Sequence, residues 1–396
     1  MSTTTLTADA LPLSTQRYRV ILAGICALIL SVGLARFAYT PMLPIMRQHA
    51  GLTDVTGGWL ATINYAGYMS GALLAAFVGD LRLKFHIYRI GLVLALLTTL
   101  AMGLTADPWL WAGLRLLAGF SSTAGLLLAS GLVLNWLIRH QHRPELGLHF
   151  AGVGLGIVVS GVAVVGTLAC SLSWDEQWLA LGALGLLFFV PAWAWMPQPP
   201  HTSVQAIAAQ PSAGAVRWMR LLIGSYFCAG FGFVISATFI VAILDKLPQL
   251  AGHGGWVWTV VGAAAVPSSF LWDRAAQRWG GINALLVAYG LQGVSVLLPA
   301  ASADVSLNLL SAALYGVTFV GIVSLSLALI GRRFPDNPAK AMARLTLSYG
   351  VAQILAPAMA GYIAQATGSY HGALWITAAV LAVGMGLLVA LNRVRE

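Results

Sequence analysis

Two arginines, Arg36 and Arg115, stand inside long apolar stretches of this 396-residue chain, where a permanent positive charge is costly. All twelve acidic residues can be placed at the chain termini or in predicted loops, so no carboxylate lies deep in an apolar stretch beside either arginine. Arginine presents a planar fork of N–H donors that fits a carboxylate in a bidentate manner. The available partners are backbone carbonyls, hydroxyl groups or an anionic ligand, and the pattern favours a cavity that attracts small organic anions.

Uncharged polar residues inside the apolar stretches form a second group of candidates. Tyr39 and Thr40 lie about one helical turn from Arg36. The other members are Asn64, Tyr226, Thr238, Tyr315, Tyr349 and Gln353. Hydroxyl and amide groups supply hydrogen bonds without charge, which suits a cavity wall, although each can instead bridge two helices. Together with the two arginines, these residues form the predicted substrate-binding set.

The elements that must position these residues are membrane-spanning helices. Hydrophobic residues make up 59% of the chain and charged residues 8%, whereas soluble domains carry about a quarter charged residues. A helix needs roughly 20 apolar residues to cross the hydrocarbon core. Twelve such segments predict an all-α membrane protein, and they run near 20–47, 56–79, 86–105, 109–138, 146–170, 177–196, 217–244, 255–272, 282–300, 305–331, 342–366 and 371–391.

The distribution of lysine and arginine predicts how these spans are oriented. With the N-terminus placed in the cytoplasm, seventeen of the 21 basic residues fall on the cytoplasmic side, and only Arg47 and Lys246 fall outside. This positive-inside bias predicts a multi-pass protein of the bacterial inner membrane with both termini in the cytoplasm. The basic residues form no long run, so the formal net charge of +9 indicates a lipid bilayer as partner and no nucleic acid.

The chain also repeats at about half its length. Four matches share an offset of 197 or 198 residues: Thr40 with Thr238, Gly119 with Gly316, Gly152-Val153 with Gly350-Val351, and Trp178 with Trp375. They describe two six-helix halves in a parallel repeat, related by an axis along the membrane normal. The longest connection is rich in Pro, Ala and Ser and reads as a linker. The predicted organisation is an N-terminal half at 1–197, a cytoplasmic linker at 198–216 and a C-terminal half at 217–396.

Two charged clusters resemble a loop motif of the major facilitator superfamily, which lies between spans two and three and is often repeated between spans eight and nine. The second copy is the clearer and reads Pro267, Trp272-Asp273-Arg274, Arg278 and Gly280. The first is degenerate: Gly79-Asp80, Arg82, Lys84 and Arg89, without the usual Gly between the basic residues. The resemblance implies a cytoplasmic gate formed by Asp80, Arg82, Asp273, Arg274 and Arg278. The alternative interpretation is that these residues are positive-inside anchors alone.

Further strings extend the resemblance over the whole chain. The fourth span reads Arg115-Leu-Leu-Ala-Gly119, which is similar to the superfamily's Arg-x-x-x-Gly motif. A bacterial subgroup, the YbfB/YjiJ-type permeases, shares Arg36-Phe37-Ala38-Tyr39-Thr40-Pro41 with Leu43-Pro44, the string from His149 to Gly156, and Ser236-Ala237-Thr238-Phe239. The resemblance implies the major facilitator fold, alternating access around a site near the midplane, and a monomer. It implies no settled substrate.

Three further observations limit the chemistry that the chain can perform. His149 lies one turn inside the cytoplasmic end of the fifth span and titrates near pH 7, so it is a candidate proton site or a plain interfacial hydrogen-bonding group. The chain shows no phosphate-binding loop with lysine, no metal-ligand cluster and no paired carboxylates. Its three cysteines fall inside or at the edge of apolar segments and read as small hydrophobic residues. We expect no catalytic residue, no metal and no cofactor, and no use of ATP.

These patterns predict a secondary active or facilitative transporter with a small organic anion or polar metabolite bound near Arg36. The alternative is a sugar or multidrug efflux permease that works as a proton antiporter, although a deep arginine without a carboxylate repels lipophilic cations. A structural role remains open for both arginines: Arg36 on carbonyls exposed around Pro41 and Pro44, and Arg115 in the packing of its motif. The sequence leaves open the substrate, the direction of flux and the coupling ion.

Overall fold

The residues described by the computed structural model, 13–142, 146–200, 213–333 and 338–394, fold into helices joined by short connections. In the first half of the chain the helices are α1 (Leu13–Leu28), η1 (Ile29–Phe37), α2 (Tyr39–His49), α3 (Asp54–Phe77), α4 (Leu81–Ala101), α5 (Pro108–Thr123), η2 (Ala124–Ala129), α6 (Ser130–Arg139), α7 (Leu146–Ala169) and α8 (Trp174–Trp195). In the second half they are α9 (Ala213–Leu244), α10 (Gly254–Ala265), α11 (Ser268–Trp279), α12 (Gly281–Ala301), α13 (Val305–Arg333), α14 (Pro338–Thr367) and α15 (His371–Asn392).

These helices make twelve rods among the described residues, because α1–η1–α2, α5–η2–α6 and α10–α11 each continue in one direction. The twelve predicted segments are therefore all present as helix, and the predicted all-α fold is confirmed. Eleven rods are long and apolar enough to cross a membrane. The exception is α3, which has 24 residues but carries several polar side chains, Asn64 and Thr62 among them.

Acidic residues at the helix starts explain where several rods begin. Asp80 caps α4 by accepting hydrogen bonds from the backbone N–H groups of Arg82 and Leu83. Asp107 caps α5 in the same way, and Ser173 with Glu176 forms a capping box on α8. A carboxylate at this position satisfies backbone donors that have no partner inside the helix. These acidic residues thus lie at the rod ends because they cap the first turns of helices.

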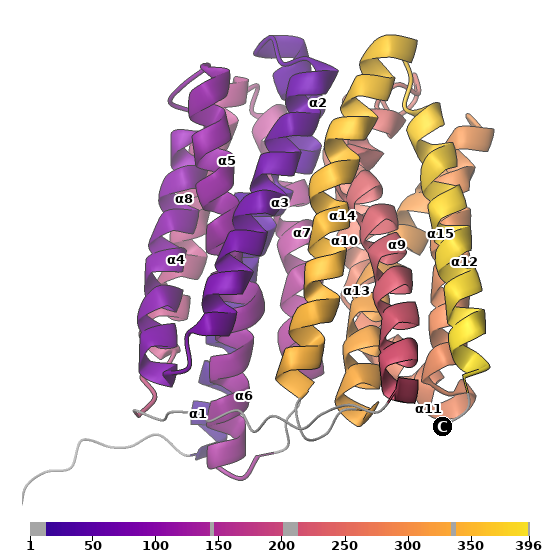
Figure 1. The fold of residues 1–396 in the computed structure, drawn as a ribbon. Coiled ribbons are helices and arrows are strands. Elements are labelled where there is room, and N and C mark those ends of the chain that lie inside the picture. Colours follow the sequence, from indigo (N-terminus) through magenta and orange to yellow (C-terminus); the bar gives the residue numbers. More distant parts are fainter. Residues whose placement is uncertain (1–12, 143–145, 201–212, 334–337, 395–396) are drawn as a thin grey trace, which may run out of the picture.

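The helices of the two halves stand side by side in Figure 1, with indigo-to-magenta α1–α8 on one side and orange-to-yellow α12–α15 on the other. The halves meet where α3 packs on α14, α7 on α10 and α2 on α9. We call the end where α1 begins and α15 ends the terminal end, and the opposite one the far end. Helix α9 begins at Ala213, inside the predicted linker, and residues 201–212 of that linker lie outside the described part of the chain.

The close approach of α7 and α10 depends on glycine. A Cβ atom added to Gly154 would lie 2.5 Å from the backbone nitrogen of Val266, and one added to Gly262 would lie 2.6 Å from that of Val158. Small residues let two membrane helices approach until their backbones touch. The contact holds a helix of each half in van der Waals contact along one seam.

Candidate functional site

Arg36 is buried on the π-helical segment η1, with 4% of its surface exposed. Its guanidinium carbon lies 4.6 Å from the ring centroids of both Tyr65 and Tyr68, and 5.3 Å from that of Phe37. Each such cation–π contact is worth about 2 kcal/mol when desolvated, against about 2.5–3.5 kcal/mol for an arginine in a membrane span on insertion scales. Aromatic rings therefore stabilise the charge where no carboxylate is present.

The rings contact the guanidinium group of Arg36 without using its N–H groups. No hydrogen bond or ion pair joins the side chain to a described residue, and its Nε atom is buried without a partner. In a cation–π contact the guanidinium group lies over the face of an aromatic ring. The N–H groups of arginine instead point outward in the plane of the guanidinium, where they can donate hydrogen bonds. Its donors are consequently available to a ligand, and a carboxylate matches them best.

Arg115 on α5 is equally buried but has protein partners. Its Nη1 atom donates to the backbone carbonyl of Ala35 at 3.1 Å, and Nη2 donates to that of Arg36 at 3.4 Å. These carbonyls lie where the π-helical turn changes to α2: the amide of Ala38 bonds to Gly33, that of Met42 bonds to Ala38, and Pro41 has no N–H. Between Ala38 and Met42, the backbone therefore offers fewer N–H groups than are needed to pair with the carbonyls of residues 34–37. Arg115 supplies the missing donors.

A cavity of about 150 Å³ lies between the halves, with Arg36 in its wall. Its lining comes from η1, α3, η2, α7, α9, α13 and α14: Val32, Arg36, Phe37, Tyr68, Leu126, Leu127, Phe150, Val153, Tyr226, Phe233, Phe319, Val320, Val323, Leu327, Thr346, Tyr349 and Gln353. No acidic residue is in this described lining, so Arg36 is its one charged group. The cavity therefore combines a single positive charge with a mostly apolar, aromatic wall.

The predicted binding set divides between this cavity and the helix interfaces. Arg36, Tyr226, Tyr349 and Gln353 line the cavity, and the Gln353 Oε1 atom is buried without a partner. Six members of the set do not line it: Tyr39, Thr40, Asn64, Arg115, Thr238 and Tyr315.

Hydrogen bonds to backbone carbonyls occupy most of these other residues. Tyr39 donates to Gly57 at 3.0 Å, and Tyr315 donates to Phe233 at 3.2 Å. Asn64 donates to the carbonyl of Arg115 at 2.8 Å, and Thr40 to that of Ala237 in the other half. Thr238 is buried in α9. Their polar groups therefore join helices together.

Sequence reasoning found Tyr226 and Tyr349 but missed the other five aromatic residues of the wall. Tyr68, Phe233 and Phe319 line the cavity, and the last two have ring centroids 5.5 Å apart. Phenylalanine in an apolar span is indistinguishable by composition from a lipid-facing residue. The one signal available was the spacing of Tyr68, which follows Asn64 by four residues and so lies about one turn further along the same face of α3. It places the ring on the packed side of that helix.

His149 lies outside the cavity wall. It is fully buried on α7, and its Nε2 atom lies 2.8 Å from the Ser130 Oγ atom. Ser130 itself donates to the carbonyl of Leu126, so it accepts from His149, which fixes the proton on Nε2. The Nδ1 atom has no partner and faces Gly24, where an added Cβ would lie 2.4 Å away. The ring thus packs α7 against α1.

The predicted gate residues lie at the terminal end. Asp273, Arg274 and Arg278 were expected in a loop after the eighth span, but they lie within helix α11, which continues to Trp279 after a break at Pro267. This corrects the expected end of that span, since the polar face of α11 is compatible with helix at the membrane surface. Arg274 lies over the ring of Phe270, and no ion pair joins Asp273 to a described residue. Asp80 and Arg82 lie at the start of α4.

Hydrogen bonds between the halves gather toward the far end. Asp54 binds Arg47 in its own half through a bidentate ion pair, with N–O distances of 2.9 and 3.0 Å, and accepts from the Tyr370 hydroxyl of the other half at 2.5 Å. Gln48 donates to Asp245 at 3.3 Å, and Trp59 to Tyr362 at 3.2 Å. We call Arg47, Asp54 and Tyr370 the far-end latch.

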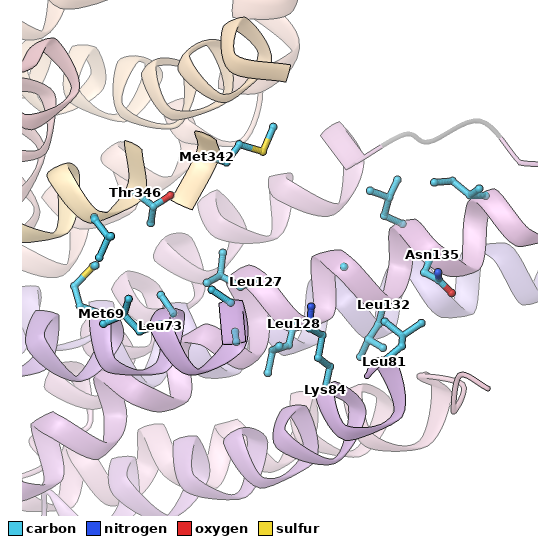
Figure 2. A pocket seen from close by; sticks show the side chains of 17 residues that line it. Met69, Leu73, Leu81, Lys84, Leu127, Leu128, Leu132, Asn135, Met342 and Thr346 are labelled. Carbon is cyan, nitrogen blue, oxygen red and sulfur yellow. The ribbon is translucent and has the colours of Figure 1, made fainter. Parts of the chain in front are cut away.

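A groove of about 450 Å³ lies between the halves nearer the terminal end, and Figure 2 shows its walls. Met342 and Thr346 of α14 face Met69 and Leu73 of α3 across it, and Lys84 is its one charged lining residue among those described. The groove shares Thr346 and Leu127 with the cavity at Arg36. The two spaces therefore adjoin, and the cavity lies beside an opening to the terminal end.

Comparison with known proteins covers nearly the whole chain. A family model described as an uncharacterised MFS-type transporter, YbfB, matches residues 28–389. A probable sulfoacetate transporter, SauU, of Cupriavidus necator is 22% identical over 92% of this chain and 91% of its own length. A gentisate transporter of Corynebacterium glutamicum is 23% identical over 78% of this chain and 74% of its own.

Two solved structures share the arrangement of helices. The nucleoside transporter NupG gives a TM-score of 0.73 at 15% identity, over 96% of this chain and 99% of that one. A bacterial homologue of the human lysosomal transporter Spinster, in an inward-facing and unoccupied conformation, gives a TM-score of 0.66 at 15% identity, over 98% of each chain. At this identity the likeness shows the fold alone.

Proposed function

The chain belongs to the YbfB-type family of MFS transporters, and from that premise we propose that it carries a small organic anion across the bacterial inner membrane by alternating access. The observation that carries the anion is Arg36. Its charge faces a cavity without a carboxylate, its guanidinium group lies over the rings of two tyrosines, and its N–H groups have no described partner. A bound carboxylate would supply both the missing charge and the missing acceptors.

The named substrates of two relatives support this choice. Sulfoacetate and gentisate, the compounds in those names, are both organic anions. The alternative, efflux of sugars or lipophilic drugs, fits the cavity less well. A sugar needs many polar partners, and a cationic drug is repelled by an arginine that no acid neutralises.

The arrangement of the halves supports the transport cycle. The far-end latch joins the halves at one end, while the groove adjoins the cavity at the other. We infer that the conformer is closed at the far end and that the terminal end, rich in arginine, faces the cytoplasm. The halves, 1–197 and 217–396, then rock about the cavity as a monomer. In the opposite conformer Asp80, Arg82, Asp273, Arg274 and Arg278 close the terminal end as a charged gate.

Ligand binding to the detergent-purified full chain tests the anion. Acetate, sulfoacetate, benzoate, glucose and a lipophilic cation are each titrated while thermal unfolding is followed. A ligand at a hundred times its dissociation constant stabilises the folded state by about 2.7 kcal/mol. We expect stabilisation by at least one anion, and by neither glucose nor the cation.

Arg36→Gln separates the site from general effects of charge. Loss of a hydrogen bond to a charged group costs about 1.5–3 kcal/mol, so the variant should bind the anion roughly 10- to 100-fold more weakly. Arg139→Gln removes one exposed charge at the terminal end and serves as the control, with unchanged binding expected. Stabilisation of wild type and Arg36→Gln alike by glucose or the cation would reject the anion and favour the efflux alternative.

A further inference from the structure

We propose that the ligand of the Arg36 cavity is a small aromatic carboxylate, with its ring among the aromatic side chains of the wall and its carboxylate on Arg36. The inference rests on the proposed function, because it takes the cavity to be the transport site. It goes further in naming the shape and class of the anion.

The wall supplies aromatic faces from both halves. Seven of the 17 lining residues are aromatic. In the second half, the rings of Tyr226 and Tyr349 lie 4.6 Å apart at 31°, and Phe233 lies 5.7 Å from Tyr349. Phe319 of the second half and Phe37, Tyr68 and Phe150 of the first half complete the aromatic lining. A planar ring placed between these walls can make offset-stacked and edge-to-face contacts, which an aliphatic chain cannot make.

The charge of the wall sets the charge of the ligand. Arg36 is the single charged group of the lining, so a single carboxylate balances it. Its guanidinium lies over Tyr68, itself a lining residue, so a carboxylate in the guanidinium plane is next to the aromatic wall. A carboxylate attached directly to a ring matches this neighbourhood of charge and aromatic surface.

A second polar side chain in the lining adds a further constraint. The Gln353 side chain is 2% exposed, and its Oε1 atom has no hydrogen-bond partner. An amide left without a partner in an apolar wall is costly unless a ligand provides one. A hydroxyl group on the ring can donate to Oε1, so a hydroxylated aromatic carboxylate satisfies the cavity more completely than benzoate does.

The size of the cavity limits the number of rings. A cavity of about 150 Å³ with apolar walls is large enough for one benzene molecule, and this one has the same volume. The cavity alone therefore has room for one ring. A disaccharide or a multi-ring drug would have to extend into the adjoining groove.

Matched ligands test the inference on the full-length, detergent-purified protein by calorimetric titration. Benzoate and 4-hydroxybenzoate are compared with cyclohexanecarboxylate, which keeps the charge and ring size but has no aromatic face. Benzamide keeps the ring without the charge, and acetate keeps the charge without the ring. We expect both aromatic carboxylates to bind at least about tenfold more tightly than the other three, since aromatic contacts add up to about one such factor each.

Two variants test which residues cause the preference for aromatic carboxylates. Arg36→Gln should remove most binding of benzoate. Phe319→Leu should narrow the ratio of affinities for benzoate and cyclohexanecarboxylate, because it removes one aromatic face from the wall. Because the wild-type comparison needs no variant, a variant that fails to fold leaves the test intact.

The outcomes separate this inference from the proposed function. If acetate or sulfoacetate binds as tightly as benzoate and through Arg36, the aromatic class is wrong and an anion transporter remains. If benzamide binds as tightly as benzoate, both the carboxylate and the proposed anion are rejected. Equal affinity for benzoate and cyclohexanecarboxylate, or no binding by either aromatic carboxylate, would overturn the inference as well.

Discussion

Arg36 and Arg115 carry the same charge in neighbouring parts of one half, yet the protein uses their donors differently. Arg115 donates to two backbone carbonyls and lies over the ring of Tyr39 at 4.3 Å. Arg36 lies over aromatic rings and has no hydrogen bond or ion pair to a described residue, so its N–H groups remain available. We infer that Arg115 stabilises the π-helical turn of the first rod and that Arg36 contacts the ligand.

Arg115→Lys should destabilise the protein without changing ligand affinity. Lysine keeps the charge, but a single ammonium group cannot reach both carbonyls as the guanidinium fork does. Leaving one buried carbonyl without a donor costs about 1–3 kcal/mol, so thermal unfolding in detergent should begin several degrees lower. Benzoate affinity, measured below that temperature, should stay within about twofold of wild type. A large loss of affinity with unchanged unfolding would instead place Arg115 at the ligand.

His149→Gln tests whether the buried imidazole carries a coupled proton. The Gln amide nitrogen can occupy the place of Nε2 and donate to Ser130, but it does not titrate. Because His149 lies outside the cavity wall and bonds Ser130, we expect the pH profile of uptake into proteoliposomes to keep its shape. Ser130→Ala, which removes the partner and no titratable group, is the control. A profile that becomes flat in His149→Gln alone would assign the proton to this residue.

Some of these residue contacts could be predicted from the sequence, and others depend on packing. A buried arginine is conspicuous in an apolar segment, so Arg36 was found from its charge. Which of the two arginines has donors free for a ligand could not be predicted. The carbonyls that accept from Arg115 are left without amide partners by a π-helical turn, and composition does not reveal such a turn. Phe233 and Phe319 were missed because a cavity wall exists only once two halves meet.

At the scale of the helix, the seam between α7 and α10 depends on glycines that admit no side chain. Gly154→Ala places a Cβ against the backbone of Val266 and Ala265, which cannot move aside as a flexible side chain would. Overpacking of this kind costs about 1–3 kcal/mol, and thermal unfolding should report it. Gly166→Ala on the same helix meets nothing within 4 Å and should be neutral or slightly stabilising, since alanine favours helix. Equal unfolding temperatures for the two variants would show that the seam can open at little cost.

The helices themselves were predictable because apolar length is a strong signal, but their interruptions were not. Predicted and observed rods agree within a few residues at most ends, for example 282–300 against Gly281–Ala301. The eighth span was predicted too short, because the charged face of α11 reads as a loop when only hydropathy is considered. The π-helical segments η1 and η2 follow from a shift in hydrogen-bond register, which side-chain composition does not encode.

At the scale of the whole molecule, hydrogen bonds join the two halves near the far end, whereas a groove separates them nearer the terminal end. Tyr370 donates across the halves to a carboxylate that Arg47 holds in place. Burial raises the pKa of the Tyr370 hydroxyl above its ordinary value, and its hydrogen bond to Asp54 adds to that rise. The hydroxyl therefore keeps its proton and donates at any working pH. The latch must break before the far end can open.

Tyr370→Phe should shift the protein toward a conformer open at the far end. The change removes one hydrogen bond to a charged group, worth about 1.5–3 kcal/mol, so the ratio of the two conformers should move by roughly 10- to 100-fold. Spin labels at Ala106→Cys and Ala303→Cys report the separation of the halves at that end, in a background where the three native cysteines are serine. Pulsed electron resonance should then show a longer distance gaining population.

Tyr88→Phe provides the matched control for this shift. Its hydroxyl donates to the carbonyl of Ala192 at 2.7 Å, within the first half, so its loss removes a buried tyrosine hydrogen bond without touching the contact between halves. We expect lower stability in Tyr88→Phe and an unchanged distance distribution. If Tyr370→Phe leaves the distances unchanged as well, the other contacts between the halves hold the far end closed, and the latch contributes to stability without governing the opening.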